Sequence, residues 1–283
     1  MAFASGQGLA RRSRWSLVLF YCVTAIILLP FLWIAFLSFK SNAQILGDPF
    51  NLSAPVTLRN YGTVLSTLNI LLLYKNTISI VIPSIVIEII ITFMSSYALS
   101  RMVFRARRLR QSLYYFLLLG LAVPSFILLF PVYRITIALH LINTYPSLIL
   151  PYVATSISFN TLLFTGFLRS FPVEIEEAAI IDGSTLWRMC VAIVFPMMKP
   201  VVVTVFIFNV LYMWNEFPFA VTLISSPMMT TISLGISQFQ GMWSIDYGAT
   251  IAAGILIIIP QLAFYGFFQR SIVEGMTAGA VKG

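Results

Sequence analysis

The chain has 283 residues, of which 59% are hydrophobic and only 9% are charged. About 25% of the residues in soluble proteins are charged, so this composition excludes a soluble globular protein and predicts an integral membrane protein. The formal net charge of +8 does not indicate nucleic-acid binding, because the basic residues flank apolar runs, as is typical of residues that orient membrane helices.

Six apolar segments are long enough to cross a lipid bilayer, because a helix rises 1.5 Å per residue and needs about 20 residues to span a hydrocarbon core of about 30 Å. Each segment is expected to be a helix, since backbone groups without partners cannot face lipid. The sequence therefore predicts an all-α, polytopic membrane protein with six transmembrane helices and one transmembrane domain over residues 1–283. The segments lie at residues 16–39, 77–99, 112–133, 147–168, 200–224 and 248–269.

The basic residues indicate how these segments are oriented. The amino-terminal tail, the intervals 100–111 and 169–199 and the carboxyl-terminal tail contain 13 of the 17 Lys and Arg residues. Positive charge is retained preferentially on the cytoplasmic side of a membrane protein. We therefore expect these four stretches, including both termini, to lie in the cytoplasm.

The interval between the fourth and fifth segments carries four of the nine acidic residues. Pro172 can begin a helix there, and the three glutamates that follow suit the positive end of a helix dipole. Gly183 can end this helix because glycine adopts the left-handed conformation without a steric penalty, and Ser184 can cap a second short helix. The sequence predicts two short helices joined by a tight turn within residues 170–196.

This loop resembles the EAA loop of binding-protein-dependent ABC importer permeases. Glu177-Ala178-Ala179 is followed by Gly183, nine further residues and then Ile193-Val194-Phe195-Pro196, with phenylalanine in the place of the usual leucine. Short EAA strings are common in ordinary amphipathic loops, but the complete spacing between two spans favours the family. The resemblance implies a coupling helix that seats on a separate cytoplasmic ATPase subunit. The implied coupling residues are Glu177, Ala178, Ala179, Asp182, Gly183 and Pro196.

Glu88 lies midway along the second apolar segment. An acidic side chain at the centre of a membrane helix costs about 2.5–3.5 kcal/mol on insertion scales, so it should face protein or water. Two interpretations stay open at this point: a polar contact in the translocation route, or a protonated or hydrogen-bonded glutamate that joins two helices.

The fifth segment carries a group of polar and aromatic residues. Positions 209, 212 and 216 share one helical face by the i, i+3, i+7 rule, so one polar stripe is expected to face inward. Amide, carboxylate and aromatic groups in a water-filled cavity suit a carbohydrate, whereas anchoring of the aromatic residues at the membrane interface is the alternative. The candidate pathway residues, with Glu88, are Asn209, Tyr212, Trp214, Asn215 and Glu216.

Trp214-Asn215-Glu216-Phe217 resembles the Trp-Asn-(Asp/Glu)-Phe motif of maltose-type carbohydrate permeases, and residues 272–283 are similar to the terminal tail of that group. The resemblance implies a type I importer permease fold in a bacterial inner membrane. It further implies a second homologous permease, two cytoplasmic ATPase subunits that bind ATP and Mg²⁺, an external substrate-binding protein and a carbohydrate substrate. No cofactor and no catalytic residue are expected in this chain.

These observations predict a permease subunit that works by alternating access and is not itself an enzyme. A permease for a non-sugar solute such as a polyamine is an alternative, because the coupling loop is shared across substrate classes. An ion-coupled secondary transporter with Glu88 and Glu216 as ion sites is another, but it needs no coupling loop. A membrane-embedded enzyme is disfavoured, because His140 is the only histidine and no convergent catalytic set is visible.

Overall fold

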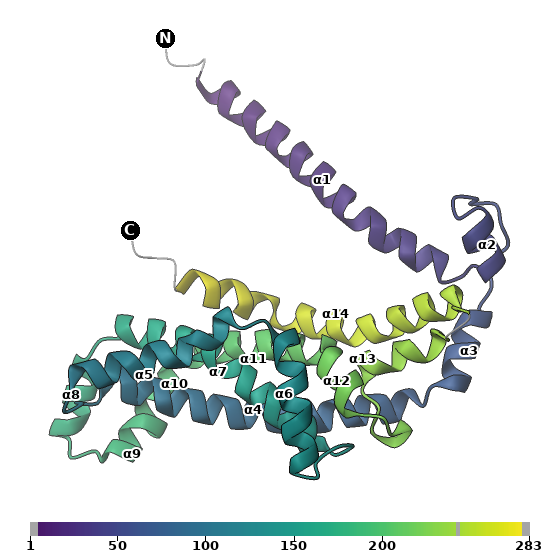
Figure 1. Ribbon diagram of the computed structural model, residues 1–283. Coiled ribbons are helices and arrows are strands. Elements are labelled where there is room, and N and C mark those ends of the chain that lie inside the picture. Colours follow the sequence, from purple (N-terminus) through teal and green to yellow (C-terminus); the bar gives the residue numbers. More distant parts are fainter. Residues whose placement is uncertain (1–4, 242–243, 279–283) are drawn as a thin grey trace. The chain divides into compact units, whose positions relative to one another are not determined.

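The computed structural model describes residues 5–241 and 244–278 (Figure 1). Within these residues the regular structure is helical apart from one isolated antiparallel bridge between Gln240 and Ile245, which confirms the all-α fold. Four helical stretches are long and apolar enough to cross a membrane, and there are up to six spans if each of two bent helix pairs forms one. The four are Trp15–Leu37, Ile70–Arg101, Tyr145–Ser170 and Tyr247–Gln269.

The chain divides into two compact units. The first contains the described residues up to Leu68 together with Ile236–Ile258. The side chains of its span Trp15–Leu37 are not buried by the rest of the chain. Its elements are α1 (Ser5–Leu37), α2 (Asn42–Gly47), α3 (Arg59–Thr67), η4 (Ile236–Phe239) and the first turns of α14 (Tyr247–Ala278). A single transmembrane domain over residues 1–283 stays a prediction, and residues 279–283 of the tail lie outside the described part of the chain.

Asn60 organises the first unit. Its side-chain amide is buried and donates hydrogen bonds to the carbonyl oxygens of Ser38, at 2.7 Å, and Lys40, at 2.8 Å. The backbone N–H of Gly248 donates to Asn42 Oδ1 at 2.9 Å, and a Cβ atom at position 248 would come within 2.7 Å of the Asn60 amide. The start of α14 therefore packs closely on the turn after α1 because position 248 is glycine.

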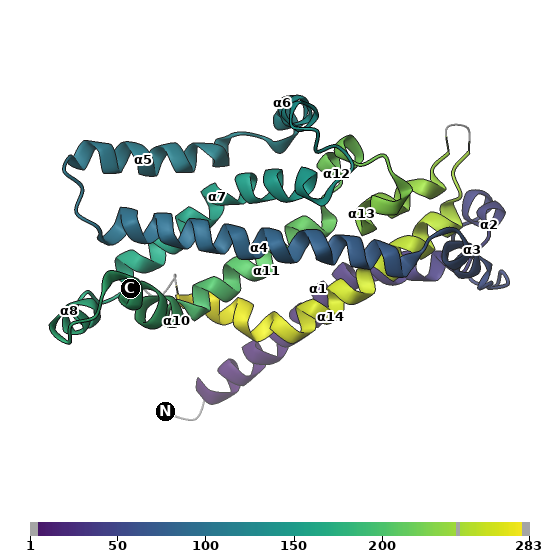
Figure 2. The ribbon, with the colours of Figure 1, turned by 90° about the horizontal axis from the view of Figure 1, so that it is seen from below.

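The second unit contains Asn69–Gly235 and the described residues from Ile259 onward. Figure 2 shows α4 and α7 lying side by side along much of their lengths, with α5 next to α7. The elements are α4 (Ile70–Arg101), α5 (Arg107–Leu119), η1 (Gly120–Ala122), α6 (Ser125–Ala138), α7 (Tyr145–Ser170), α8 (Glu174–Ile181), α9 (Leu186–Arg188), η2 (Met189–Val194), α10 (Phe195–Met197), α11 (Lys199–Asn215), α12 (Pro218–Leu223), η3 (Pro227–Met229), α13 (Ile232–Gly235) and the later turns of α14.

Two of the expected spans are interrupted, and a proline lies next to each break. The stretch 112–133 bends by 103° between Arg107–Ala122 and Ser125–Ala138, because Val123, which precedes Pro124, has an extended backbone. A proline disfavours helical geometry in the residue before it. The expected helix over 200–224 is likewise wrong beyond Asn215, since Glu216 is extended and Pro218 begins the separate helix α12.

The core of the second unit consists of two hydrophobic clusters. One cluster joins the ends of α4 and α7 to the loop that follows α7, and it includes Phe93, Phe164 and Val194. The other joins the opposite parts of α4 and α7 to α12, with Tyr152 and Phe219 fully or almost fully buried. The helices α4, α7 and α11 contribute to both clusters and so form the scaffold on which the loop and the cavity described below are placed.

Candidate functional site

The loop after α7 begins with α8, whose first turn carries the three expected glutamates. The helix ends at Asp182, and Gly183 has a φ of +74°, as predicted for a left-handed terminus. The N–H of Gly183 donates to the carbonyl of Ile180, and the N–H of Ser184 donates to that of Ala179, both at 2.9 Å. The predicted helix end at this glycine is confirmed.

Two details of the predicted loop are wrong. Pro172 precedes the helix, because α8 begins at Glu174 and Val173 is its cap. The second short helix is capped by Thr185, whose hydroxyl oxygen accepts a hydrogen bond from the N–H of Arg188 at 3.3 Å. Ser184 does not cap it, since its own N–H closes the turn after α8. The predicted arrangement of two short helices is present, and each helix starts one or two residues later than expected.

The motif residues of the loop fall on two sides of α8. Glu177, Ala178, Asp182 and Gly183 are exposed, and so is Pro196 in α10. Ala179 is instead buried against the core cluster beside the loop. The motif therefore presents one face to the outside and anchors the other in the membrane-spanning helices.

An apolar surface surrounds the exposed face of the motif. Ile181 is 85% exposed and Trp187 is 67% exposed, and Ile180 and Leu186 also face outward. Large apolar side chains gathered on one short loop are typical of a protein-interaction surface. The loop therefore has the chemistry of a contact site for another protein.

A buried ion pair ties α8 to the end of α4. Arg101, the last residue of α4, places its Nε atom 2.7 Å from Oε1 of Glu176. The hydroxyl of Tyr97 donates to Oε2 of Glu176 at 2.9 Å, and Arg101 Nη2 donates to the carbonyl of Phe171 at 2.8 Å. We call Tyr97, Arg101 and Glu176 the clamp. The sequence analysis missed it, although Glu176 and Ala179 are three residues apart and so share the buried face of α8.

A cavity of about 630 Å³ lies among η1, α6, α7 and α11. Its volume falls within the range of about 300–1,000 Å³ that is usual for small-molecule sites. Most of its wall is apolar, and hydroxyl, phenol and amide groups are spaced along it. The polar residues in the wall are Ser125, Thr155, Ser156, Ser158, Asn209 and Tyr212.

Of the six candidate pathway residues, Asn209 and Tyr212 line this cavity. The Asn209 amide donates to Asn160 Oδ1 at 2.8 Å and to the carbonyl of Val205 at 2.9 Å, which fixes its orientation. Tyr212 is 43% exposed, and its hydroxyl lies beside those of Ser125 and Thr155 in the same wall. The two residues share one face of α11, as the three-residue spacing predicted.

Glu216 does not continue that stripe. The helix ends at Asn215, so the periodicity no longer applies at the next residue. The Glu216 carboxylate accepts hydrogen bonds from the backbone N–H groups of Phe219, at 2.7 Å, and Ala220, at 3.2 Å, and from the hydroxyl of Tyr152 at 2.7 Å. A carboxylate in this position satisfies the free donors at the start of α12 and ties that helix to α7.

The other three candidates are not among the residues that line the cavity. Glu88 is fully buried beside two residues of α7, Ser156, which lines the cavity, and Asn160. Its position in the interior favours the interpretation of a residue between packed helices. The ring of Trp214 lies 5.9 Å from that of Tyr74 on α4. Asn215 is exposed and donates to the carbonyl of Leu211 in its own helix.

The comparisons with known proteins agree with this geometry. Residues 96–277 match the model of the family described as binding-protein-dependent transport system inner membrane component. The chain belongs to this family. The family resemblance inferred from the coupling loop is thereby confirmed, and the chain is a membrane component of a transport system.

Two relatives and one solved structure cover nearly the whole permease. A putative ABC transporter permease protein, ORF2 of Caldicellulosiruptor sp. strain Rt8B.4, is 38% identical over 95% of this chain and 97% of its own. The diacetylchitobiose uptake system permease protein NgcG of Streptomyces coelicolor is 33% identical over 92% and 85%. A chain of a bacterial ABC transporter involved in alginate import has the same fold, with a TM-score of 0.76 at 20% identity over 95% and 99%.

The clamp makes a prediction about stability. Removing one member of a buried ion pair typically costs about 3–5 kcal/mol, because the other charge is left unpaired. Arg101→Ala and Glu176→Ala should each lower the melting temperature of the purified permease, and the double variant should lower it by less than the sum of the two single changes. The coupling energy from this double-mutant cycle should be about 1–3 kcal/mol. The matched control is Arg105→Ala, at an exposed position in the segment between α4 and α5. Additive losses from the two single changes would show that the pair does not act as a unit.

Proposed function

We propose that this chain imports a carbohydrate across the bacterial cytoplasmic membrane as one permease subunit of a binding-protein-dependent ABC importer. The observation that carries the proposal is the exposed apolar face of the EAA loop, which the clamp joins to the helices around the cavity. The cavity supports a carbohydrate because its wall offers amide, hydroxyl and phenol groups beside apolar surface. The likeness to a diacetylchitobiose permease supports the same substrate class.

The partners follow from the surfaces that the chain leaves open. Two cytoplasmic ATPase subunits bind ATP and Mg²⁺, and one of them contacts α8, whose outer face carries Ala178 and Ile181. A second, homologous permease completes the translocation route, and an external binding protein delivers the sugar. Both termini lie in the cytoplasm, which is supported by the 13 of 17 basic residues in the tails and the intervals 100–111 and 169–199.

Force passes from the ATPase to the cavity through packed helices. Closure of the ATPase subunits displaces α8, and the hydrogen bond that Glu176 accepts from Tyr97, together with the ion pair of Glu176 with Arg101, carries this displacement to α4. The helix α4 packs along α7, and α7 and α11 both line the cavity. The cavity therefore opens to alternate sides as the ATPase cycles, which is a rigid-body transition of the kind seen in domain closure.

Gly183 is the most direct place to test this coupling. Its backbone has a φ of +74°, and nothing lies within 4 Å of a Cβ atom built there, so a substitution acts through the backbone and not through a clash. Gly183→Val should cost about 1–2 kcal/mol or more locally and misplace α8, which abolishes sugar-stimulated ATP hydrolysis in the reconstituted transporter. Gly183→Asn is the matched control, because asparagine tolerates the left-handed conformation. Equal activity of the two variants would contradict the role of this turn.

The contact with the ATPase can be measured by cross-linking. Ala178 and Ile181 face outward, whereas Ala179 is buried. A cysteine at position 178 should cross-link to an engineered cysteine in the ATPase, with a yield that changes when ATP is added. A cysteine at 179 should react poorly. Absence of a cross-link from 178 and 181 in every nucleotide state would contradict the proposed contact.

The substrate assignment is tested at the cavity wall. Tyr212→Phe removes one hydroxyl and should raise the half-saturating sugar concentration for uptake by about 3–10-fold, which corresponds to one hydrogen bond. Tyr133→Phe on α6, outside the cavity lining, should leave uptake unchanged. The measurement uses the transporter reconstituted in proteoliposomes with its binding protein and a radiolabelled disaccharide. If spermidine stimulated ATP hydrolysis and none of the carbohydrates tested did so, the permease would belong to another substrate class.

A further inference from the structure

A second pocket lies at one end of the second unit, apart from the cavity and from α8. It has a volume of about 270 Å³ and is formed by the last turns of α4 and α7 and the first turns of α5. The spans Ile70–Arg101 and Tyr145–Ser170 end at this pocket, and the pair that includes α5 begins there. The pocket therefore lies at the level where membrane helices meet water and lipid headgroups.

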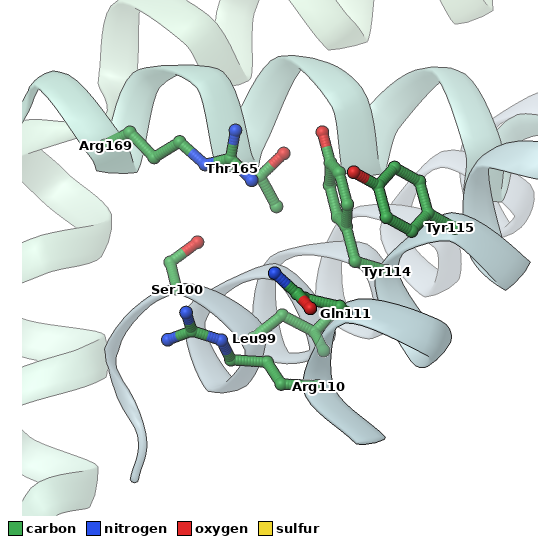
Figure 3. A pocket seen from close by; sticks show the side chains of 8 residues that line it. All are labelled: Leu99, Ser100, Arg110, Gln111, Tyr114, Tyr115, Thr165 and Arg169. Atoms are coloured by element: carbon green, nitrogen blue, oxygen red, sulfur yellow. The ribbon is translucent and has the colours of Figure 1, made fainter. Parts of the chain in front are cut away.

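Seven of the eight residues that line this pocket carry a hydrogen-bond donor in the side chain. Arg110 on α5 and Arg169 on α7 lie on opposite sides of it, as Figure 3 shows. Arg169 is held over the ring of Tyr114, with its guanidinium carbon 4.9 Å from the ring centroid. Other donors come from Ser100, Gln111 and Tyr115, whereas the hydroxyl of Thr165 donates to the carbonyl of Thr161.

No carboxylate lines the pocket. Within the described residues, neither Arg110 nor Arg169 forms an ion pair. Two uncompensated guanidinium groups together with hydroxyl and amide donors select an anion that has several acceptor oxygens. Guanidinium groups bind phosphate in a bidentate manner, so phosphate fits this donor set better than a single carboxylate does.

The surroundings of the pocket indicate where such a phosphate comes from. Tyr115 in the pocket wall is 63% exposed, and Leu119, four residues further along the same face of α5, is 62% exposed. These two side chains form a largely apolar stripe that starts at the pocket and runs toward the middle of the span. An acyl chain can lie along this stripe while its headgroup occupies the pocket.

We propose that this pocket binds the phosphate headgroup of an anionic phospholipid such as phosphatidylglycerol, with its acyl chains along α5. Basic pockets between membrane helices are suited to such headgroups. The proposal rests on the membrane insertion of α4, α5 and α7 and not on sugar transport. If the lipid site were disproved, the proposed function would therefore be unaffected. If the proposed function were disproved, the lipid site would likewise be unaffected.

The test compares lipid retention by purified permease variants. Wild-type protein, extracted from membranes and washed in detergent, should retain phosphatidylglycerol in mass spectrometry, and Arg110→Gln/Arg169→Gln should retain about tenfold less. The matched control is Arg105→Gln/Arg108→Gln, which removes the same charge from exposed positions outside the pocket. It should retain phosphatidylglycerol as the wild type does. Equal retention by the pocket variant and the wild type, or equal loss in the control, would overturn the proposal.

Two further arms identify the ligand in wild-type protein. A photoreactive phosphatidylglycerol should label peptides that contain residues 107–119, and a phosphatidylcholine probe should label them much less. Glycerol phosphate, which has the phosphate but no acyl chain, should not displace the bound lipid at millimolar concentration. Displacement by glycerol phosphate or inorganic phosphate would show that the site takes a soluble anion, and labelling confined to other helices would place the lipid elsewhere. Either result would overturn the assignment to a lipid headgroup.

Discussion

The interaction on which the rest of the structure depends is the ion pair between Arg101 and Glu176, completed by the hydroxyl of Tyr97. A short loop helix of eight residues has little stability of its own, because helix nucleation is costly. Here α8 is held by a charged contact at the point where α4 ends, and Ala179 packs into the same core cluster. The arrangement leaves the outer face of α8 available for a partner while its inner face is fixed to the scaffold.

The cavity depends on a second constraint, which is that backbone groups freed inside a membrane must find partners. The prolines at 124 and 218 lie at breaks in two spans, and Val123 and Ser125, on either side of Pro124, line the cavity. Glu216 accepts from two backbone N–H groups of α12 and so stabilises one of these interruptions. Glu216, which the sequence suggested as a substrate contact, is thereby explained as part of the scaffold that holds α12 against α7.

Much of this organisation could be predicted from the sequence, because hydrophobic length and turn chemistry are local properties. The apolar segments, the helix end at Gly183 and the shared face of Asn209 and Tyr212 follow from local patterns. The clamp could not be found this way, since Tyr97 and Glu176 are 79 residues apart and meet only through the packing of α4 on α7. The helical stripe failed at Glu216 because periodicity holds only while the helix continues.

The central claim is that α8 moves as one body with α4, so that the ATPase acts on the cavity through the clamp. Spin labels at Ile181 on α8 and Ile82 on α4, both exposed, allow the distance between them to be measured by pulsed electron spin resonance in the complete transporter. The account predicts that this distance stays constant within about 2 Å between the nucleotide-free and the ATP-bound states, and that Glu176→Gln broadens and shifts it. A larger ATP-dependent change in the wild-type protein would show that α8 moves independently of α4 and would contradict the account.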